Sequence, residues 1–227
     1  CPLSIIEPAW IADCKRFMPH RSIVSLWSRN PKIRKRRLAE EHQVYAANFE
    51  TFKSMFKDLQ AKGFKVMIID ESSKIKSPKS QVTRAALALA GIKMRGRKGA
   101  AFDADQIIPH RYVLSGTPAP NDRSEYWSQM SFVAPGEVFS RNFYSFRGRY
   151  FTARPLGRTG VNLYSFTKDR KLAEEFNSQM APFADVVNKE AAVDLPEQIH
   201  EIRYVKLSGP EQTAYEKLRR ELVIKLA

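Results

Sequence analysis

Two acidic residues follow a short apolar run, and together they have the chemistry to bind a metal ion and to activate water. The run Val66-Met-Ile-Ile leads into Asp70 and Glu71. One carboxylate at such a position can hold Mg²⁺, and its neighbour can orient or polarise a water that attacks a phosphate. The alternative is an ordinary acidic turn that keeps the end of a strand soluble, so the pair alone does not establish a site.

A second polar turn lies about 45 residues further along the chain. The segment Tyr112-Val-Leu is followed by Ser115-Gly-Thr117-Pro, and then by Asn121. Small hydroxyl side chains at the end of a strand can donate hydrogen bonds to carboxylates on a neighbouring strand and to a phosphate. Glycine and proline also end strands in many proteins, so a plain turn is the alternative.

Both turns are expected at the same edge of a parallel sheet. Up to about residue 133, short apolar runs alternate with amphipathic stretches, which predicts an α/β fold with helices on both faces of a parallel sheet. The apolar run 66–70 is typical of a strand buried on both faces. In such sheets ligands bind at the carboxyl ends of the strands. Further strands are expected at 22–27, 43–48 and 110–114, and helices at 7–17, 31–42, 51–62, 77–90 and 121–132.

The residue pattern of the last third of the chain predicts a helical and irregular C-terminal extension. Residues 137–151 are dense in aromatic residues and arginines, which either stack on exposed bases or pack a helical insert while the arginines face water. A helix near 168–180 and a strand over 198–207 are expected, and Ser208-Gly-Pro-Glu211 is a capping box for a last helix. Residues 91–109 are expected to form an irregular, exposed loop.

Taken together, the two polar turns resemble motifs II and III of the superfamily two helicases. The closer resemblance is to the Swi/Snf-type branch of DNA-dependent ATPases, and the segment Asp70-Glu-Ser-Ser73-x-Ile-Lys76 is most similar to versions encoded by bacteriophages and prophages. Cys1-Pro2-Leu3-Ser4 followed by Trp10 resembles motif Ia of that branch, and Ala47-Asn48-Phe-Glu-Thr51 resembles motif Ib. The segments Leu195-Pro, Val205-Lys-Leu-Ser and Gln212-x-x-Tyr215 resemble the entry into the second motor lobe.

The resemblance implies part of a motor that hydrolyses MgATP and moves along double-stranded DNA. It implies three segments: a RecA-like first lobe over residues 1–135, an aromatic and basic helical insert over 136–195, and the start of a second RecA-like lobe over 196–227. By the same resemblance, Asp70 holds the magnesium ion of MgATP and Glu71 activates water. Ser115 and Thr117 couple the nucleotide site to DNA, and the residues expected to face DNA are Pro2, Leu3, Ser4, Asn48 and Thr51.

The sequence departs from the family pattern in three places, one of them residues 183–190, where Ala184-Asp185 stand in place of the paired arginines that the family often has. Motif II has Ser73 where the DEAD and DEAH versions have aspartate or histidine. No G-x-x-x-x-G-K-[ST] loop occurs in these 227 residues; the nearest match, residues 91–98, has Arg97 at the lysine position and follows a helical pattern. The opening Cys-Pro-Leu-Ser is therefore expected to be the start of a piece of a longer chain, and motifs V and VI are expected beyond it.

Composition limits the classes of function. The 38 lysine and arginine residues exceed the 24 aspartate and glutamate residues by 14, which suits a polyanionic partner such as DNA. Two cysteines cannot build a disulfide framework. The sequence has neither a secretion signal nor a membrane-length apolar run, so we expect a protein of the cytoplasm of a bacterial or phage-infected cell. The oligomeric state is not predicted.

Two other functions fit parts of the sequence. One is a non-catalytic nucleic-acid-binding module with a degenerate motor fold. The basic segment Arg34–Arg37, for its part, could contact DNA or could be a solvated helix face. The other is a metal-dependent nuclease, for which Asp169-Arg-Lys171 has the required residue types. That segment lies in a helical, polar stretch, so we rank the nuclease last.

The chain alone is predicted not to hydrolyse ATP measurably, because it contains no phosphate-binding loop and no motif VI arginine. An arginine finger alone is worth about 10³–10⁵ in rate in other motors and switches. The measurement is DNA-stimulated phosphate release by the purified chain. Clear turnover that is abolished in Glu71→Gln would contradict this prediction.

Overall fold

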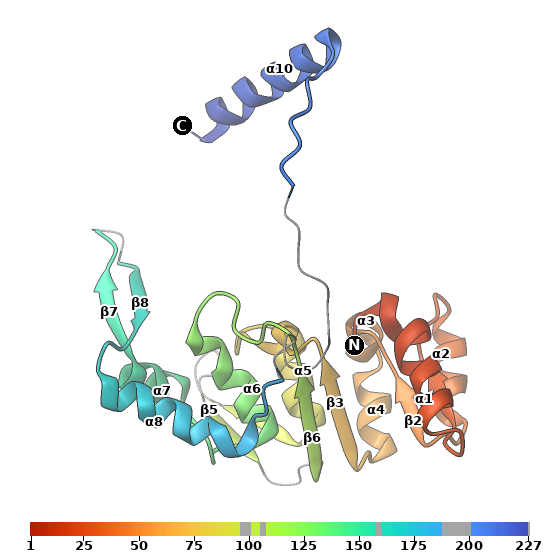
Figure 1. Cartoon of the computed structure of the whole chain (residues 1–227). Coiled ribbons are helices and arrows are strands. Elements are labelled where there is room, and N and C mark those ends of the chain that lie inside the picture. Colours follow the sequence, from red (N-terminus) through yellow and green to blue (C-terminus); the bar gives the residue numbers. More distant parts are fainter. Residues whose placement is uncertain (96–100, 105–107, 158–159, 188–200, 227) are drawn as a thin grey trace. The chain divides into compact units, whose positions relative to one another are not determined.

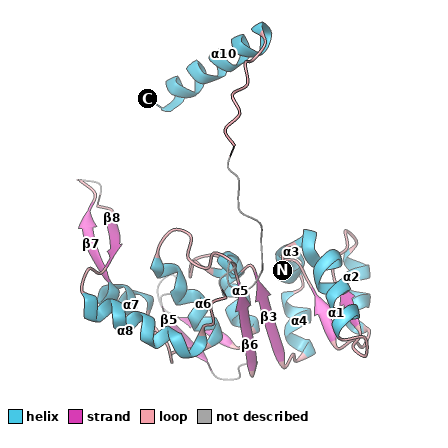
Figure 2. Cartoon of the chain, in the orientation of Figure 1, coloured by secondary structure: helices cyan, strands magenta, loops and turns pink. Residues whose placement is uncertain are grey.

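A parallel pair of strands holds the segments that carry the two polar turns. The computed structural model describes residues 1–95, 101–104, 108–157, 160–187 and 201–226. Strand β3 (Val66–Asp70) pairs with β6 (His110–Leu114) with Asp70 opposite Leu114, and β1 (Ile23–Ser25) pairs in parallel with β2 (Val44–Ala46). The chain divides into two units, residues 1–185 and 186–227. The mixed α/β class is as predicted (Figures 1 and 2).

The helices begin where the sequence supplies side chains that cap them. An asparagine, serine or aspartate side chain accepts a hydrogen bond from a backbone N–H of the first turn, which satisfies a group that has no partner within the helix. The helices capped in this way are α2 (Pro31–Ala39) by Asn30, α3 (Phe49–Ser54) by Asn48, α5 (Gln81–Leu89) by Ser80, α7 (Phe143–Tyr150) by Asn142 and α8 (Arg170–Met180) by Asp169.

The remaining elements are the long helix α10 (Gly209–Leu226) and a set of short helical segments. One half of the capping box expected at Ser208 is present, because the Ser208 N–H donates to Glu211 Oε2 (2.9 Å) at the start of α10. Helix α4 (Phe56–Lys62) ends at Gly63, whose φ of 72° suits glycine. The others are η1 (Leu3–Ile5), the π-helical turn η2 (Ile6–Ile11), α1 (Ala12–Phe17), η3 (Ser72–Ile75), η5 (Arg123–Glu125), α6 (Tyr126–Val133) and η6 (Ala181–Phe183).

Three expected elements differ in the structure. The single helix expected at 51–62 is two helices, α3 and α4, which meet at Met55. Part of the loop expected at 91–109 is an antiparallel pair, β4 (Ile92–Arg95) and β5 (Ala101–Ala104); residues 96–100 and 105–107 lie outside the described residues. Residues 201–207 form no strand, while 198–200 lie outside the described part. An alternating pattern does not make a strand without a neighbouring strand to pair with.

One face of the β3–β6 pair differs from the expected burial. The side chains of Val66, Ile68, Tyr112 and Leu114 are about half-exposed, whereas Ile69 is buried. A strand buried on both faces was therefore the wrong expectation for 66–70 within the described residues. Apolar residues such as Val66 and Ile68 are typical of a parallel strand that is covered on both faces. Here helices cover only the face that carries Ile69.

Arg111 joins β6 to the end of α6. Its guanidinium donates to the carbonyl oxygens of Phe132 and Val133, each at 2.7 Å, and to that of Ile108. The last carbonyls of a helix have no partner within the helix, so an arginine at this place satisfies them. Burial lowers the Arg111 pKa from its ordinary value, although the group remains charged.

The aromatic segment forms a shared core with the lobe. Phe146, Tyr150 and Phe176 are buried, and they belong to the same cluster as Ile69 of β3 and Trp127 of α6. This packing supports the insert interpretation over base stacking for these rings. The hairpin β7 (Phe151–Pro155) and β8 (Asn162–Phe166) extends from α7 and α8 (Figure 2).

A charged group fixes α7 against α8. Arg149 donates to both carboxylate oxygens of Glu175 (2.7 and 2.6 Å), and the Tyr150 hydroxyl donates to Oε1 (2.6 Å). The hydrogen bonds from Arg149, and then that from Tyr150, lower the pKa of Glu175 to about 2. Burial, followed by the bond to Glu175, raises the pKa of Tyr150 to about 12.

This depressed carboxyl pKa predicts an acid-sensitive insert. The contribution of Glu175 to stability is fully present above its unfolded pKa of about 4.3 and is lost as the pH falls towards about 2. Glu175→Gln should therefore lower the unfolding temperature at pH 6, with the difference from the wild type vanishing near pH 2. Thermal unfolding across this range checks it, with Glu174→Gln as control. A difference that does not change with pH would contradict the prediction.

Candidate functional site

The register of β3 and β6 brings the acid pair and Ser115 to one edge. Because Asp70 lies opposite Leu114, the residues that follow these two, Glu71 and Ser115, leave the sheet side by side. The Ser115 hydroxyl donates to Glu71 Oε1 at 3.3 Å, although 44 residues separate the two positions. The structure thus joins the two turns on which the sequence analysis depended, at the carboxyl end of parallel strands, where open α/β sheets bind ligands.

Asp70 is held in place by two donors. Its Oδ1 accepts from the Glu71 backbone N–H (2.9 Å), and its Oδ2 accepts from the Trp10 indole Nε1–H (2.9 Å). Trp10 comes from the turn η2, so a segment 60 residues away orients the carboxylate. The sequence analysis included Trp10 only as part of a motif. An indole N–H in a partly buried position needs an acceptor, which was the signal available.

Glu71 has a backbone conformation that is unusual for its residue type. It is the one non-glycine residue in the described part of the chain with positive φ (59°, with ψ 60°). Such a left-handed conformation costs about 1–3 kcal/mol and persists only where the surroundings enforce it, most often at functional sites. Besides Ser115, the Ser73 hydroxyl donates to Glu71 Oε1. Two hydroxyl groups therefore fix one carboxylate oxygen.

Ser73, the residue at which motif II departs from the family pattern, contacts the acid pair. The position is a serine where related motifs have aspartate or histidine, and here its hydroxyl contacts the candidate water-activating carboxylate. A serine can donate to Glu71 without adding a second negative charge next to it. The substitution is therefore compatible with the acid pair.

Thr117 lies further from the acids. Its backbone N–H donates to Ser115 Oγ (3.2 Å), and its side chain is exposed. The geometry therefore links Thr117 to Glu71 through Ser115. Its hydroxyl is accessible to a group outside this unit.

The buried side chain of Gln129 hydrogen-bonds to both loops of the site, the one after β3 and the one after β6. Gln129 of α6 is 1% exposed; its Oε1 accepts from Ser72 Oγ (2.6 Å), and its Nε2 donates to the carbonyl oxygens of Pro118 (2.7 Å) and Glu125 (3.0 Å). Ser72 directly follows the acid pair and Pro118 directly follows Thr117. The sequence analysis missed Gln129, for which a polar residue in the apolar surroundings of α6 was the only signal.

An ion pair strengthens the same connection nearer the surface. Lys76 Nζ lies 3.0 Å from Glu125 Oε1, and the side chain of Asn121 donates to the same carboxylate. Lys76 follows the acid-pair loop, whereas Asn121 and Glu125 follow the Ser-Gly-Thr-Pro turn. Partial burial of Lys76 and Glu125 makes this pair less exposed to screening than a fully solvated one.

The residues expected to face DNA differ in exposure. Leu3 and Ser4 are exposed and Pro2 is half-buried. In contrast, Asn48 and Thr51 are 5% and 2% exposed, and Asn48 Oδ1 accepts from the Thr51 N–H (3.2 Å) as the cap of α3. The side chains of Asn48 and Thr51 thus have a structural role here, and a DNA contact for them stays a prediction.

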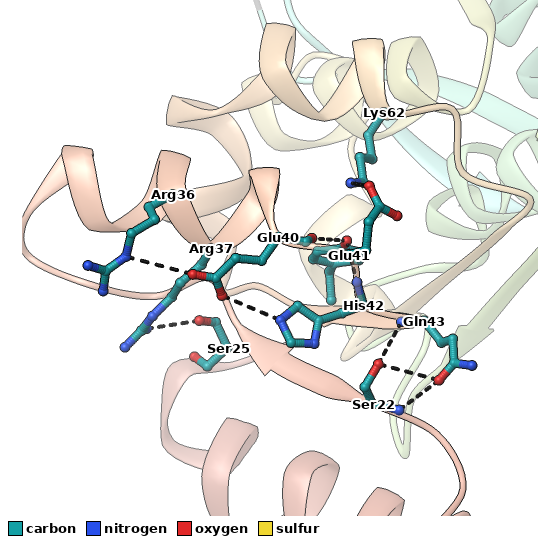
Figure 3. Close-up of polar contacts among 10 residues, drawn as sticks. Ser22, Ser25, Arg36, Arg37, Glu40, Glu41, His42, Gln43 and Lys62 are labelled. Atoms are coloured by element: carbon teal, nitrogen blue, oxygen red, sulfur yellow. Dashed lines mark hydrogen bonds and ion pairs between the residues drawn. The ribbon is translucent and has the colours of Figure 1, made fainter.

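The basic helix α2 is engaged with its own surroundings. Arg36 pairs with Glu40 (3.7 Å), and Arg37 donates to the carbonyl oxygen of Ser25 (2.9 Å), as Figure 3 shows. Lys35 lies 3.7 Å from Asp58, and Arg34 donates to Ser54 (2.8 Å). The four basic side chains therefore have intramolecular contacts, which favours the interpretation as a solvated helix face over a dedicated DNA surface.

Asp169, on which the nuclease alternative depends, has a structural role in this fold. Asp169 Oδ1 accepts from the backbone N–H groups of Lys171 (2.8 Å) and Leu172 (3.3 Å), so it serves as the cap of α8. In the part of the chain that the structure describes, no three His, Cys, Asp or Glu side chains gather in a way that could hold a metal ion. The helices that the structure describes include none long and apolar enough to cross a membrane.

The fold and this edge define a helicase-like α/β unit, and comparison with known proteins identifies its family. A model of the SNF2-related domain matches residues 1–95 and 101–227, and the chain belongs to this family. The predicted Swi/Snf-type membership and the α/β fold class are thereby confirmed.

Individual relatives match nearly the whole chain at low identity. The human lymphoid-specific helicase is 24% identical over 94% of this chain, an uncharacterized ATP-dependent helicase of Mycoplasma genitalium 25% over 95%, and the nuclear protein STH1/NPS1 of Saccharomyces cerevisiae 24% over 96%. The chain spans 24%, 18% and 15% of the length of these three relatives. The family is thus one of helicase-like ATPases.

The Gln129 connection predicts a non-additive pair of substitutions. Ser72→Ala leaves Gln129 Oε1 without its donor, and Gln129→Leu leaves the Ser72 hydroxyl and the Pro118 carbonyl without partners. Each should cost about 1–3 kcal/mol of the free energy of unfolding. The double variant should cost less than the sum, by about 1 kcal/mol, since the pair is then removed together. Denaturant unfolding of the four proteins measures this, and strictly additive losses would show that the bond has no such role.

Proposed function

We propose that this chain supplies the water-activating edge of an ATP-driven motor that translocates on double-stranded DNA. The observation that carries the proposal is the contact between Glu71 and Ser115 across the β3–β6 edge, with Asp70 fixed by Trp10. Membership in the SNF2-related domain family and the ATP-dependent helicase among the relatives support it. We propose that MgATP is hydrolysed in the full-length gene product rather than by the chain alone.

Glu71 is the proposed base for the attacking water. Its left-handed backbone projects the carboxylate from the end of β3, and the hydroxyls of Ser73 and Ser115 both donate to Oε1. Because both hydroxyls donate to Oε1, we assign Oε2 as the oxygen that would accept a proton from water. Phosphoryl transfer depends mainly on positioning and electrostatics, which a carboxylate fixed in this way supplies.

The donor set at this edge fits magnesium and a nucleotide phosphate. Mg²⁺ prefers oxygen ligands and is commonly bound by only one or two carboxylates together with phosphates and water. Asp70 provides such a carboxylate, oriented by two hydrogen bonds, and Glu71 and Ser115 add oxygens beside it. We propose that Asp70 holds the ion. When bound, Mg²⁺ neutralises charge that develops on the transferred phosphate.

Ser115 and Thr117 are the proposed link between nucleotide and DNA. Ser115 contacts both the carboxylate of Glu71 and the backbone of Thr117, so movement of the turn changes the environment of Glu71. The positive charge of the chain suits the phosphate backbone of DNA. Exposed Leu3 and Ser4, together with Pro2, are proposed to face that backbone, while Asn48 and Thr51 hold the start of α3 in place.

Replacement of Glu71 distinguishes the motor from a non-catalytic binding module. In the full-length gene product, Glu71→Gln keeps the size of the side chain but removes the negative charge that polarises water. Turnover should fall by about 10²-fold or more, with MgATP and DNA affinity nearly unchanged. Steady-state ATPase assays and nucleotide titrations measure both quantities. Glu41→Gln, at an exposed position whose carboxylate pairs with Lys62, is the control.

The companion variant tests the magnesium assignment. Asp70→Asn keeps an acceptor for Trp10 but removes an anionic ligand, so the Mg²⁺ concentration needed for half-maximal activity should rise. A Glu71→Gln protein with near-normal turnover would show that the acid pair is not catalytic, and the non-catalytic nucleic-acid-binding module would then be the better description.

A further inference from the structure

The β7–β8 hairpin carries an exposed apolar and basic face. Arg154 lies opposite Leu163 in the ladder. The Leu156 N–H donates to the Val161 carbonyl (2.8 Å), so these two residues also lie opposite each other, two positions further along and on the same face as Arg154 and Leu163. Leu163 and Val161 are 52% and 54% exposed, and Arg154 is exposed. Exposed aliphatic side chains in a row on one ribbon face are typical of a contact surface.

The opposite face of the hairpin is used for anchoring. Phe151 and Phe166 stack edge to face with their ring centroids 5.5 Å apart, and Phe166 also contacts Phe176 of α8 (5.1 Å). The Arg147 guanidinium lies 3.7 Å from the ring centroid of Tyr164. The root of the ribbon is therefore fixed to α7 and α8, while the other face is presented to solvent.

Charge identifies the kind of partner. The hairpin segment, residues 151–166, contains Arg154 and Arg158 and no aspartate or glutamate, so the ribbon itself is basic. Arg149 and Arg170 are paired with glutamates of α8, whereas Arg154 lies on the aliphatic face itself. A basic, ribbon-like surface complements a polyanion rather than a second copy of a chain with a net charge of +14.

We propose that the β7–β8 hairpin binds in the major groove of duplex DNA as a second contact of the motor. The major groove, about 12 Å wide, admits a two-stranded ribbon. Arg154 would contact a phosphate, and Leu163 with its neighbours would contact the apolar groove surface, including thymine methyl groups. The inference rests on the DNA partner proposed above and assigns it a site outside the acid-pair edge.

Two variants separate the ionic from the apolar part of this contact. Duplex affinity of the full chain is measured by fluorescence anisotropy at several salt concentrations. Arg154→Ala should weaken binding by about three- to tenfold and reduce the slope of log K against log salt by about 0.9. Leu163→Ser should weaken binding about threefold with an unchanged slope. Arg170→Ala, which removes the same charge from α8, is the matched control and should have a smaller effect.

The groove assignment has its own readout. Wild-type chain should protect guanine N7 in the major groove from methylation by dimethyl sulfate, and the Arg154→Ala/Leu163→Ser double variant should lose this protection. Both side chains are exposed, so thermal unfolding of the variants should match the wild type, which checks that they fold.

The outcomes that overturn the proposal are distinct from those that overturn the motor. Wild-type affinity in both single variants overturns the hairpin contact and leaves the Glu71 assignment intact. Loss of self-association in Leu163→Ser, with unchanged DNA binding, assigns the face to a protein contact and also overturns it. A wild-type chain that binds no duplex contradicts the DNA partner itself.

Discussion

The parallel register of β3 with β6 determines the geometry of the whole candidate site. Because Asp70 lies opposite Leu114, the residues that follow them, Glu71 and Ser115, lie side by side. The Ser115 hydroxyl is 3.3 Å from Glu71 Oε1. A shift of one residue would turn every side chain of β3 to the other face of the sheet. Ile69 would leave the core and the acids would no longer meet Ser115. Burial of Ile69 therefore enforces both the core and the alignment of the acid pair.

Helix α6 converts this alignment into a fixed distance between two loops. Arg111 holds the end of the helix to β6, and Gln129 in its middle bonds to the loop on each side of the edge. Because Gln129 is buried, its hydrogen bonds have no competition from water, and the loss of either partner is costly. The strained backbone of Glu71 can persist in this setting, since the residues on both sides of it are anchored.

Local pattern was sufficient to predict much of this arrangement. Strand 66–70, the acid pair, the serine turn and the cap at Ser208 all depend on residues close together in the sequence. The contacts of Trp10 with Asp70 and of Gln129 with Ser72 join segments 60 and 57 residues apart, and no local pattern states which side chains will meet. The β4–β5 pair was missed although Ile92-Lys-Met-Arg95 alternates apolar and basic residues, because the many basic residues of 91–109 favoured an exposed loop over so short an alternation.

The aromatic core links the insert to the lobe that carries the acids. Trp127 of α6 lies two residues before Gln129, and it packs edge to face against Phe143 of α7 (5.3 Å between ring centroids). Four residues before Trp127, Arg123 of η5 lies over the ring of Phe166 in β8 (4.4 Å), just before α6 begins. The hairpin root and the glutamine that spans the site are thus attached to the same helix. A force or a bound partner at the hairpin acts on a body that is continuous with α6, because close-packed interiors transmit displacement rather than absorb it.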